Sequence, residues 1–145
     1  YPGTIIGYSE YFYTHTQDNF INDLSKARTY TLHEDIEKMR TAGLAIGGNL
    51  NNAIVVDKYK ILNPEGLRFD KEFIKHKILD CIGDFYMSGL PLLGSIHATQ
   101  PGHELNNRWL KKIFEDDDNY KIIELNPYYL SISQQKNILN NINVA

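Results

Sequence analysis

One stretch near the middle of the chain limits most strongly what the chain can fold into. Residues 71–88 form the longest run with helical spacing, between Asp70, a suitable N-cap, and Gly89, which would end the helix. At about 100° per residue, the apolar side chains of this run fall on one arc of the helix. They are Ile74, Ile78, Cys81, Ile82 and Phe85. We therefore expect an amphipathic helix that packs on one face of a sheet.

The rest of the chain mixes predicted strands and helices without a regular β-α-β alternation. The expected strands are 4–13, 27–31, 53–56, 67–69, 92–98 and 120–125. The expected helices are 18–26, 32–42, 71–88 and 103–114, and the polar tail holds either a helix over 134–141 or a frayed segment. Gly43 is placed to end the second helix, and residues 63–66 are typical of a turn. This mixture indicates an α+β protein.

Length and composition exclude several classes of protein. The 145 residues, of which 42% are hydrophobic, suit one globular domain. A net charge of −3 argues against binding nucleic acid by coating phosphates, and the presence of only 1 Cys excludes an internal disulfide. No apolar run approaches the ~18 residues of a membrane span, and the first residues lack a secretory signal. We expect a cytoplasmic protein, and the start at Tyr1 suggests a chain processed or cut from something longer.

A polar stripe on the central helix gives the strongest indication of chemistry. His76, Asp80 and Asp84 recur every four residues, with Lys77 at the edge of the stripe, so these side chains are neighbours. His76 and Asp80 can therefore reach one metal ion together, and an imidazole with a carboxylate suits Zn²⁺. A weak ion pair is the simpler interpretation, because a zinc site needs at least three protein ligands and this pair supplies two. Spacing alone leaves both interpretations open.

A second histidine lies at the start of a predicted helix. His103 directly follows Gly102, a residue type that lets the backbone turn tightly and approach a ligand. The positive end of the helix dipole disfavours a charged imidazole there, so a catalytic imidazolium would need a nearby carboxylate. Asp84 is the natural candidate for that carboxylate. The alternative is a histidine in a first helical turn that has no special role.

Several motifs, in a fixed order, resemble one enzyme family. They are 27–29 (ART), 43–48 (GLAIGG), 52–57 (NAIVVD), 62–69 (LNPEGLRF), 72–84 (EFIKHKILDCIGD) and 102–107 (GHELNN). The most specific part is the His-Lys-x-x-Asp-x-x-Gly-Asp core, followed by Gly-His-x-Leu-Asn. From about residue 27 to residue 114, the chain resembles UDP-3-O-acyl-N-acetylglucosamine deacetylase, the zinc amidase of lipid A biosynthesis.

The resemblance implies an enzyme of two similar domains, each a two-layer sheet-and-helix sandwich with a ribosomal protein S5 domain 2-like topology. This chain resembles the second domain, over 1–125, with a βαβ insert at about 30–56 and a polar tail at 126–145. His76 and Asp80 would be two of the three Zn²⁺ ligands. The missing first domain would be the partner of this chain. It would hold the third ligand, a His, beside the Glu that acts as general base.

The resemblance also implies how the remaining polar residues act on the substrate, a UDP-linked acylated glucosamine. Lys77 would help to hold charge near the reacting water, and Thr29 would donate a hydrogen bond to the tetrahedral intermediate. His103 would stabilise the oxyanion and protonate the leaving amine, with Asp84 fixing its ring. The N-acetyl group would be the group that is hydrolysed.

The βαβ insert would hold the acyl chain of the substrate in an apolar passage. The matching positions are Tyr30, Leu32, Ile36, Ala45, Gly48 and Val55. A glycine in such a wall leaves width for methylene groups. The same residues also fit an ordinary core. Tyr30-Thr31 stands where the family usually has Phe-Gly, so the mouth of the passage would differ from that of its relatives.

The resemblance implies that half of the catalytic site lies outside this chain. We therefore expect the isolated chain to be inactive and to bind zinc weakly. Two other functions are open: a non-catalytic interaction module that shares the fold, and a related zinc deacetylase that acts on another acylated amine.

Overall fold

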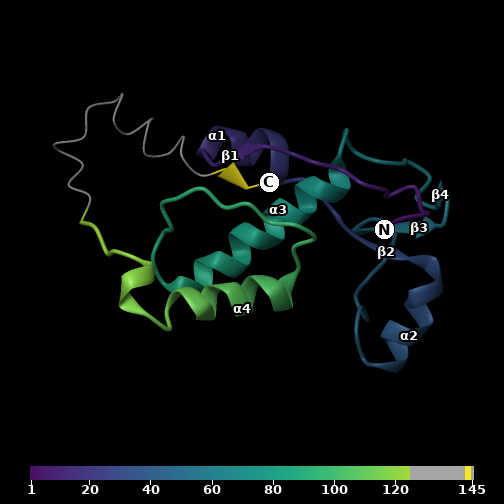
Figure 1. The fold of residues 1–145 in the computed structure, drawn as a ribbon. Coiled ribbons are helices and arrows are strands. Elements are labelled where there is room, and N and C mark those ends of the chain that lie inside the picture. Colours follow the sequence, from purple (N-terminus) through teal and green to yellow (C-terminus); the bar gives the residue numbers. More distant parts are fainter. Residues whose placement is uncertain (125–142, 145) are drawn as a thin grey trace.

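The computed structural model describes residues 1–124 and 143–144. Helix α3 (Glu72–Phe85) runs through the middle of the protein, and helix α4 (His103–Ile113) lies along it (Figure 1). A three-stranded sheet with the order β2-β3-β4 lies at the N-terminal end of α3. The described residues therefore form a small α+β domain, as the sequence predicts. The helix expected over 134–141 lies outside the described residues.

Helix α3 confirms the predicted amphipathic helix. It continues as a 3₁₀ turn, Tyr86–Ser88, and ends at Gly89, whose φ of 79° is left-handed. The predicted N-cap at Asp70 is wrong. The residue before the helix is Lys71, with a φ of 58° and no side-chain cap, and the buried Glu72 side chain instead turns back to accept the backbone N–H of Arg68.

The sheet is built around a parallel pair of strands with a helix between them. Strand β2 (Thr29–Leu32) pairs in parallel with β3 (Ala53–Asp57), so that Tyr30 lies opposite Ile54. Helix α2 (Ile36–Thr41), preceded by a 3₁₀ turn, connects the two strands, and Gly43 follows it with a φ of 73°. Strand β4 (Lys60–Ile61), which the sequence did not predict, pairs antiparallel with β3.

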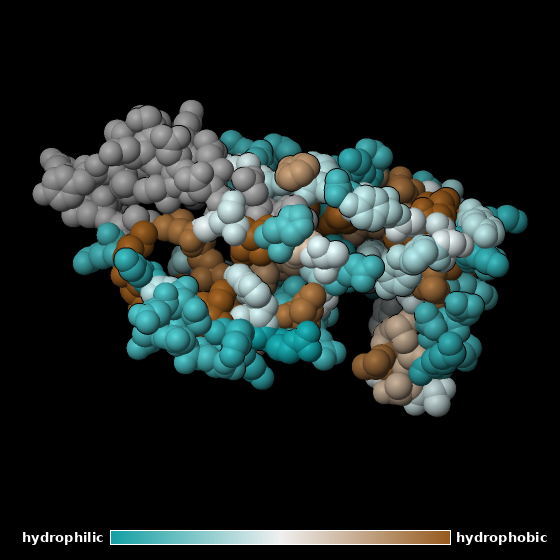
Figure 2. Space-filling view, in the orientation of Figure 1, coloured by the Kyte–Doolittle hydropathy of each residue, from teal (hydrophilic) through white to brown (hydrophobic). Residues whose placement is uncertain are grey.

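Helix α2 and the loop after it form a lobe that projects from the rest of the protein (Figure 1). Apolar residues gather at the tip of this lobe in the space-filling view (Figure 2). Leu44 and Ile46, in the loop, are largely exposed.

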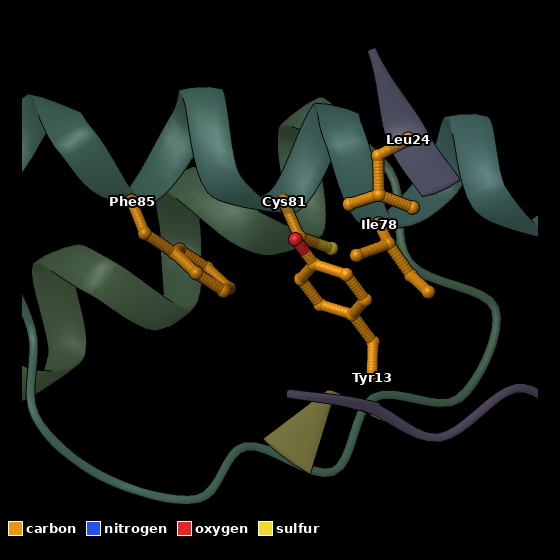
Figure 3. Close-up of a cluster of buried hydrophobic side chains, with 5 residues drawn as sticks. All are labelled: Tyr13, Leu24, Ile78, Cys81 and Phe85. Atoms are coloured by element: carbon orange, nitrogen blue, oxygen red, sulfur yellow. The ribbon is translucent and has the colours of Figure 1, made fainter. Parts of the chain in front are cut away.

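Two apolar clusters hold the layers together, and α3 contributes to both. Phe73 packs with Ile54 and Val56 of the sheet. The other face of the helix packs on the segment before the sheet, in the cluster drawn in Figure 3. That cluster consists of Tyr13, Leu24, Ile78, Cys81 and Phe85. Because both clusters share α3, the helix has a fixed place relative to β2.

In the first part of the chain, the predicted helix forms, but most of the predicted strand does not. Helix α1 (Gln17–Asn19) continues as a π-helical turn, Phe20–Leu24, and Thr16 accepts the backbone N–H of Asn19 as its N-cap. Of the strand expected over 4–13, only Tyr13 lies in a strand, as the first residue of β1 (Tyr13–Thr14), which pairs antiparallel with β5 (Asn143–Val144).

Three other expected strands do not form, and one physical reason explains all of them. Residues 67–69 and 120–124 form no strand, and 92–98 contains only an isolated bridge at Ile96. Leu67, Leu92 and Ile96 pack side chains against the apolar clusters, but within residues 1–124 and 143–144 no run of these segments continues into a strand. Apolar content predicts burial, but a strand also needs a backbone partner.

Among the described residues, no helix combines the length and the apolar character that a membrane span requires.

Candidate functional site

The polar stripe of α3 brings His76 and Asp80 together. Nδ1 of His76 lies 3.4 Å from Oδ2 of Asp80, and the two side chains are only 15% and 12% exposed. That nitrogen is buried and makes no hydrogen bond with any residue that the structure describes, because the contact with Asp80 lacks hydrogen-bond geometry. Burial lowers the pKa of His76 below its ordinary value, although the charge of Asp80 acts in the opposite direction. The imidazole is therefore held neutral, with an unused nitrogen facing a carboxylate.

The start of α4 adds the second histidine to this group. Nδ1 of His103 lies 2.9 Å from both carboxylate oxygens of Asp84. On the other side of the ring, Nε2 of His103 lies 4.0 Å from Oδ1 of Asp80. The His103 side chain is 69% exposed, whereas Asp84 is 13% exposed. Two separate imidazole–carboxylate pairs thus meet on one surface of α3, with His103 open to solvent.

Lys77 and Tyr30 form the border of this polar group. Nζ of Lys77 lies 3.6 Å from Oδ2 of Asp80 and 5.7 Å from the centre of the Tyr30 ring. The Tyr30 ring also stands edge-on to His76 and Phe73, with centroid distances of 6.3 and 5.1 Å. Burial raises the pKa of the Tyr30 phenol, so the hydroxyl stays neutral.

Asn106 of α4 is a site residue that the sequence reasoning missed. Its side chain is buried, and Nδ2 donates to Oδ2 of Asp84 at 2.8 Å. Its Oδ1 accepts the thiol of Cys81 at 3.7 Å, and burial raises the pKa of that thiol to about 11. A clue was available in the sequence: Asn106 is three residues after His103, so both lie on one face of the helix.

An apolar cavity of about 710 Å³ lies between β2, β3 and the α2 lobe. Five of the six residues predicted to hold an acyl chain line it, namely Tyr30, Ile36, Ala45, Gly48 and Val55. The sixth, Leu32, is not part of the lining and packs instead on the core cluster of Ile54, Val56 and Phe73. Thr29 lies at the cavity and not among the contacts of the two histidines. The ring of Tyr30 lines the cavity and also contacts His76. The cavity therefore lies next to the cluster of His76, Asp80, Asp84 and His103.

Other residues complete the cavity wall. The apolar ones that the sequence reasoning missed are Met39, Leu50, Ala53 and Leu62. Polar side chains on the lining are Thr31, His33, Arg40, Asn49 and Asn52. The cavity is thus mainly apolar with a few polar groups, as is common in small-molecule sites.

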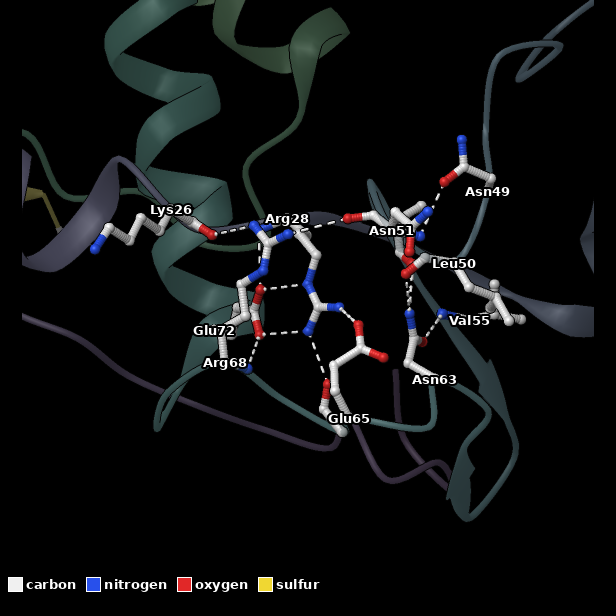
Figure 4. Close-up of polar contacts among 12 residues, drawn as sticks. Lys26, Arg28, Asn49, Leu50, Asn51, Val55, Asn63, Glu65, Arg68 and Glu72 are labelled. Carbon is white, nitrogen blue, oxygen red and sulfur yellow. Dashed lines mark hydrogen bonds and ion pairs between the residues drawn. The ribbon is translucent and has the colours of Figure 1, made fainter.

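A buried ion pair fixes the cavity strand against the helix that carries His76. The carboxylate of Glu72 in α3 accepts hydrogen bonds from the backbone N–H and the guanidinium of Arg28, and from the backbone N–H of Arg68 (Figure 4). Burial alone would raise the pKa of the Glu72 carboxyl, but these hydrogen bonds outweigh burial and hold the pKa below its usual value. The residues that follow Arg28 in β2, Thr29 and Tyr30, are placed relative to α3 by these bonds.

Comparison with known proteins decides the family. Residues 1–115 match the LpxC family, described as UDP-3-O-acyl N-acetylglycosamine deacetylase. The chain belongs to this family.

Individual LpxC relatives are longer than this chain. A UDP-3-O-acyl-N-acetylglucosamine deacetylase of Campylobacter fetus is 42% identical over 125 residues, which cover 86% of this chain and 42% of that enzyme. The deacetylase of the same name from Psychrobacter arcticus is 51% identical over 105 residues, covering 72% of this chain and 33% of the relative. That of Marinobacter nauticus is 49% identical over 105 residues, which are 72% of this chain and 34% of the relative. The chain therefore spans less than half of the length of these LpxC relatives.

The side-chain atoms of His76 and Asp80 fit, in kind and in spacing, two ligands of the zinc ion that the LpxC resemblance leads us to expect. Two ligand atoms that each lie about 2.1 Å from one tetrahedral ion are about 3.4 Å apart, which is the distance observed between these two atoms. Within the described residues, the buried Nδ1 of His76 makes no hydrogen bond, so its lone pair is not used by another group. Within residues 1–124 and 143–144, no group of three or more His, Cys, Asp or Glu side chains is arranged to hold a metal. This part of the LpxC chain thus offers two donors of the kinds that zinc uses.

Proposed function

We propose that this chain forms one side of the active site of a zinc-dependent amidase, which hydrolyses the N-acetyl group of UDP-3-O-acyl-N-acetylglucosamine in lipid A biosynthesis. The observation that carries the proposal is the meeting of the His76–Asp80 and His103–Asp84 pairs next to a large apolar cavity. An amidase for an acylated sugar needs such a combination, with proton-transfer groups at the amide and an apolar site for the acyl chain.

His76 and Asp80 would hold the zinc ion, together with a ligand from the part of the enzyme outside this chain. When bound, zinc polarises a carbonyl and lowers the pKa of water, so that water can attack an amide at neutral pH. The neutral state of His76, which burial favours, is the state that binds metal. A Glu in the part of the enzyme outside this chain would act as the general base.

The other polar residues would act on the amide itself. Water adds to the acetyl carbonyl, the C–N bond breaks, and acetate and the sugar amine are released. His103 would stabilise the oxyanion and give a proton to the leaving amine, since its ring is exposed and Asp84 holds Nδ1. Lys77 would add positive charge beside Asp80, and Thr29 would donate a hydrogen bond to the intermediate.

The acyl chain of the substrate would occupy the cavity between β2, β3 and the α2 lobe. The volume of about 710 Å³ lies within the range of small-molecule sites. Tyr30 would stand between the acyl chain and the reacting amide, because its ring contacts both the cavity and His76.

The proposal includes the architecture of the whole enzyme. Residues 1–125 would be its second domain, a two-layer sandwich of the ribosomal protein S5 domain 2-like topology, in which β2, α2 and β3 form an insert. The remaining domain would complete the site, and the enzyme would work in the cytoplasm. On its own, this chain would be inactive and would bind zinc weakly, since one ligand and the general base lie elsewhere.

A hybrid enzyme tests the proposal. In the hybrid, this chain replaces the matching 125 residues of the Campylobacter fetus deacetylase. Release of acetate from the acylated UDP-sugar is then measured with and without added zinc. We expect zinc-dependent release by the hybrid and none by the 145-residue chain alone. In the hybrid, His76→Ala should abolish release. His97→Ala, which makes the same change at an exposed residue outside the site, should leave it unchanged.

The outcomes separate the proposal from its rivals. Full activity of the hybrid with His76→Ala would contradict the role of His76 and favour an interaction module. Equal rates on substrates with and without the acyl chain would favour a deacetylase for another amine, because an enzyme that uses the cavity loses rate when the chain is removed.

A further inference from the structure

Asn106 connects the core of the protein to the proposed acid His103 through two contacts of its amide group. Nδ2 donates to Oδ2 of Asp84 at 2.8 Å, and Oδ1 accepts from Sγ of Cys81 at 3.7 Å. Asp84 in turn holds Nδ1 of His103. Asn106 and Cys81 are both buried, whereas His103 is largely exposed. The chain of contacts thus runs from the packed interior to a solvent-exposed imidazole.

Only one orientation of the Asn106 amide satisfies both neighbours. If the amide were turned over, its oxygen would face the Asp84 carboxylate and both groups would be acceptors, which repel each other. Its NH₂ group would then face the thiol of Cys81, a weak acceptor, and the buried donor would lose its strong partner. The Asp84 carboxylate therefore sets the orientation of the amide, and the Cys81 thiol supports it by donating to Oδ1.

We propose that Asn106 is a positioning residue for His103: it holds Asp84 in place, and the Cys81 thiol supports the direction of the Asn106 amide. Asp84 faces His103 with both oxygens, and Asn106 is the buried donor that keeps the carboxylate from rotating toward solvent. Asn106 and His103 both belong to the first turns of α4. One helix therefore supplies the imidazole and the amide that holds its partner, the Asp84 carboxylate. The catalytic meaning of this role rests on the proposed function, but the contacts do not.

The first test uses NMR on the 145-residue chain and does not need activity. A free neutral imidazole carries its proton mostly on Nε2, whereas a carboxylate that accepts from Nδ1 keeps a proton there. At mildly alkaline pH, we expect the ¹⁵N signals of His103 to show a protonated Nδ1 in the unsubstituted chain. Asn106→Leu, which keeps the volume but removes the donor, should shift the proton toward Nε2. Asn107→Leu, the same change one residue further along α4, should not.

A second pair of variants keeps the test valid if Asn106→Leu does not fold. Cys81→Ala removes the donor to Oδ1 of Asn106 without touching Asn106, and Cys81→Ser restores a donor at the same position. We expect the Nδ1 proton of His103 to be partly lost with Cys81→Ala and recovered with Cys81→Ser. An unchanged His103 signal in all three variants would overturn the proposal. A change with Asn106→Leu alone would overturn the part that concerns Cys81.

The second test measures kinetics in the hybrid enzyme described above. Asn106→Leu should lower kcat about 10- to 100-fold, as loss of a supporting partner commonly does, with KM changed no more than about twofold. A merely structural role would lower the amount of folded enzyme and leave the kcat of the folded fraction unchanged. If the unsubstituted hybrid has no deacetylase activity, the proposed function fails, while the NMR result still decides the role of Asn106.

Discussion

The guanidinium of Arg28 and the carboxylate of Glu72 meet inside the protein, with Nε of Arg28 2.9 Å from Oε1 of Glu72. The two side chains are 2% and 0% exposed. Glu72 also accepts the backbone N–H groups of Arg28 and Arg68, so the carboxylate has strong donors on both oxygens. Full pairing is what makes a buried charge tolerable. This contact joins the strand of the cavity to the helix of the two proposed zinc ligands.

Removing one partner should strongly destabilise the protein. Arg28→Met leaves the Glu72 carboxylate buried without its main partner, and loss of one member of a buried pair costs about 3–5 kcal/mol. Urea unfolding followed by circular dichroism measures this change in the free energy of unfolding. The exposed pair of Lys38 and Asp35 is the control, since Lys38→Met should cost no more than about 1 kcal/mol. Equal losses for the two variants would show that the Arg28–Glu72 contact is not buried in solution.

Local spacing in the sequence predicted the elements that carry the site. The apolar arc and the polar stripe of α3 follow from a 3.6-residue period, and β3 follows from a continuous apolar run. His103 at the start of α4 followed from the preceding glycine. These predictions succeed because each depends on residues within a few turns of one another.

The contact of His103 with Asp84, 19 residues apart, was predicted from the chemistry that an imidazolium needs, but other contacts between distant parts of the chain were not predictable from spacing. Arg28 and Glu72 are 44 residues apart, and Asn106 and Asp84 are 22 apart, so no periodic pattern links them. The cavity has the same limit, because Ile36 in a cavity wall has the same local pattern as a core residue. The resemblance to known enzymes placed five lining residues, whereas Leu32 faces the core cluster.

The thiol of Cys81 should make stability depend on alkaline pH. Burial raises its pKa from 9.0 to about 11, so folding favours the protonated form. The resulting stabilisation is complete below pH 9 and is lost as the pH rises through about 11; it is on the order of 2 kcal/mol. Cys81→Ser has no thiol to ionise. The difference in unfolding free energy between the unsubstituted chain and this variant should therefore shrink between pH 9 and 11. A constant difference across that range would contradict the raised pKa.

The cluster that seats α3 should be sensitive to loss of Leu24. This side chain is fully buried against Tyr13 and Ile78 (Figure 3). Leu24→Ala leaves a cavity, which typically costs about 2–5 kcal/mol. Leu44→Ala makes the same change at a residue that is 59% exposed, and should change the unfolding free energy by no more than about 0.5 kcal/mol. Thermal and urea unfolding of both variants would give the comparison, and a small effect at Leu24 would place it outside the core.

Filling the cavity should weaken the use of long acyl chains without affecting the amide chemistry. Ile36 lines the cavity on the α2 side, and a larger side chain there takes the space of several methylene groups. Each excluded methylene loses about 0.8 kcal/mol of burial, so excluding two should raise KM for the acylated substrate roughly tenfold or more. In the hybrid enzyme, Ile36→Trp should show this rise, while the rate on an analogue without the acyl chain stays the same. Ile21→Trp, at an exposed residue outside the cavity, is the matched control. Equal effects of Ile36→Trp on both substrates would mean that the cavity does not hold the acyl chain.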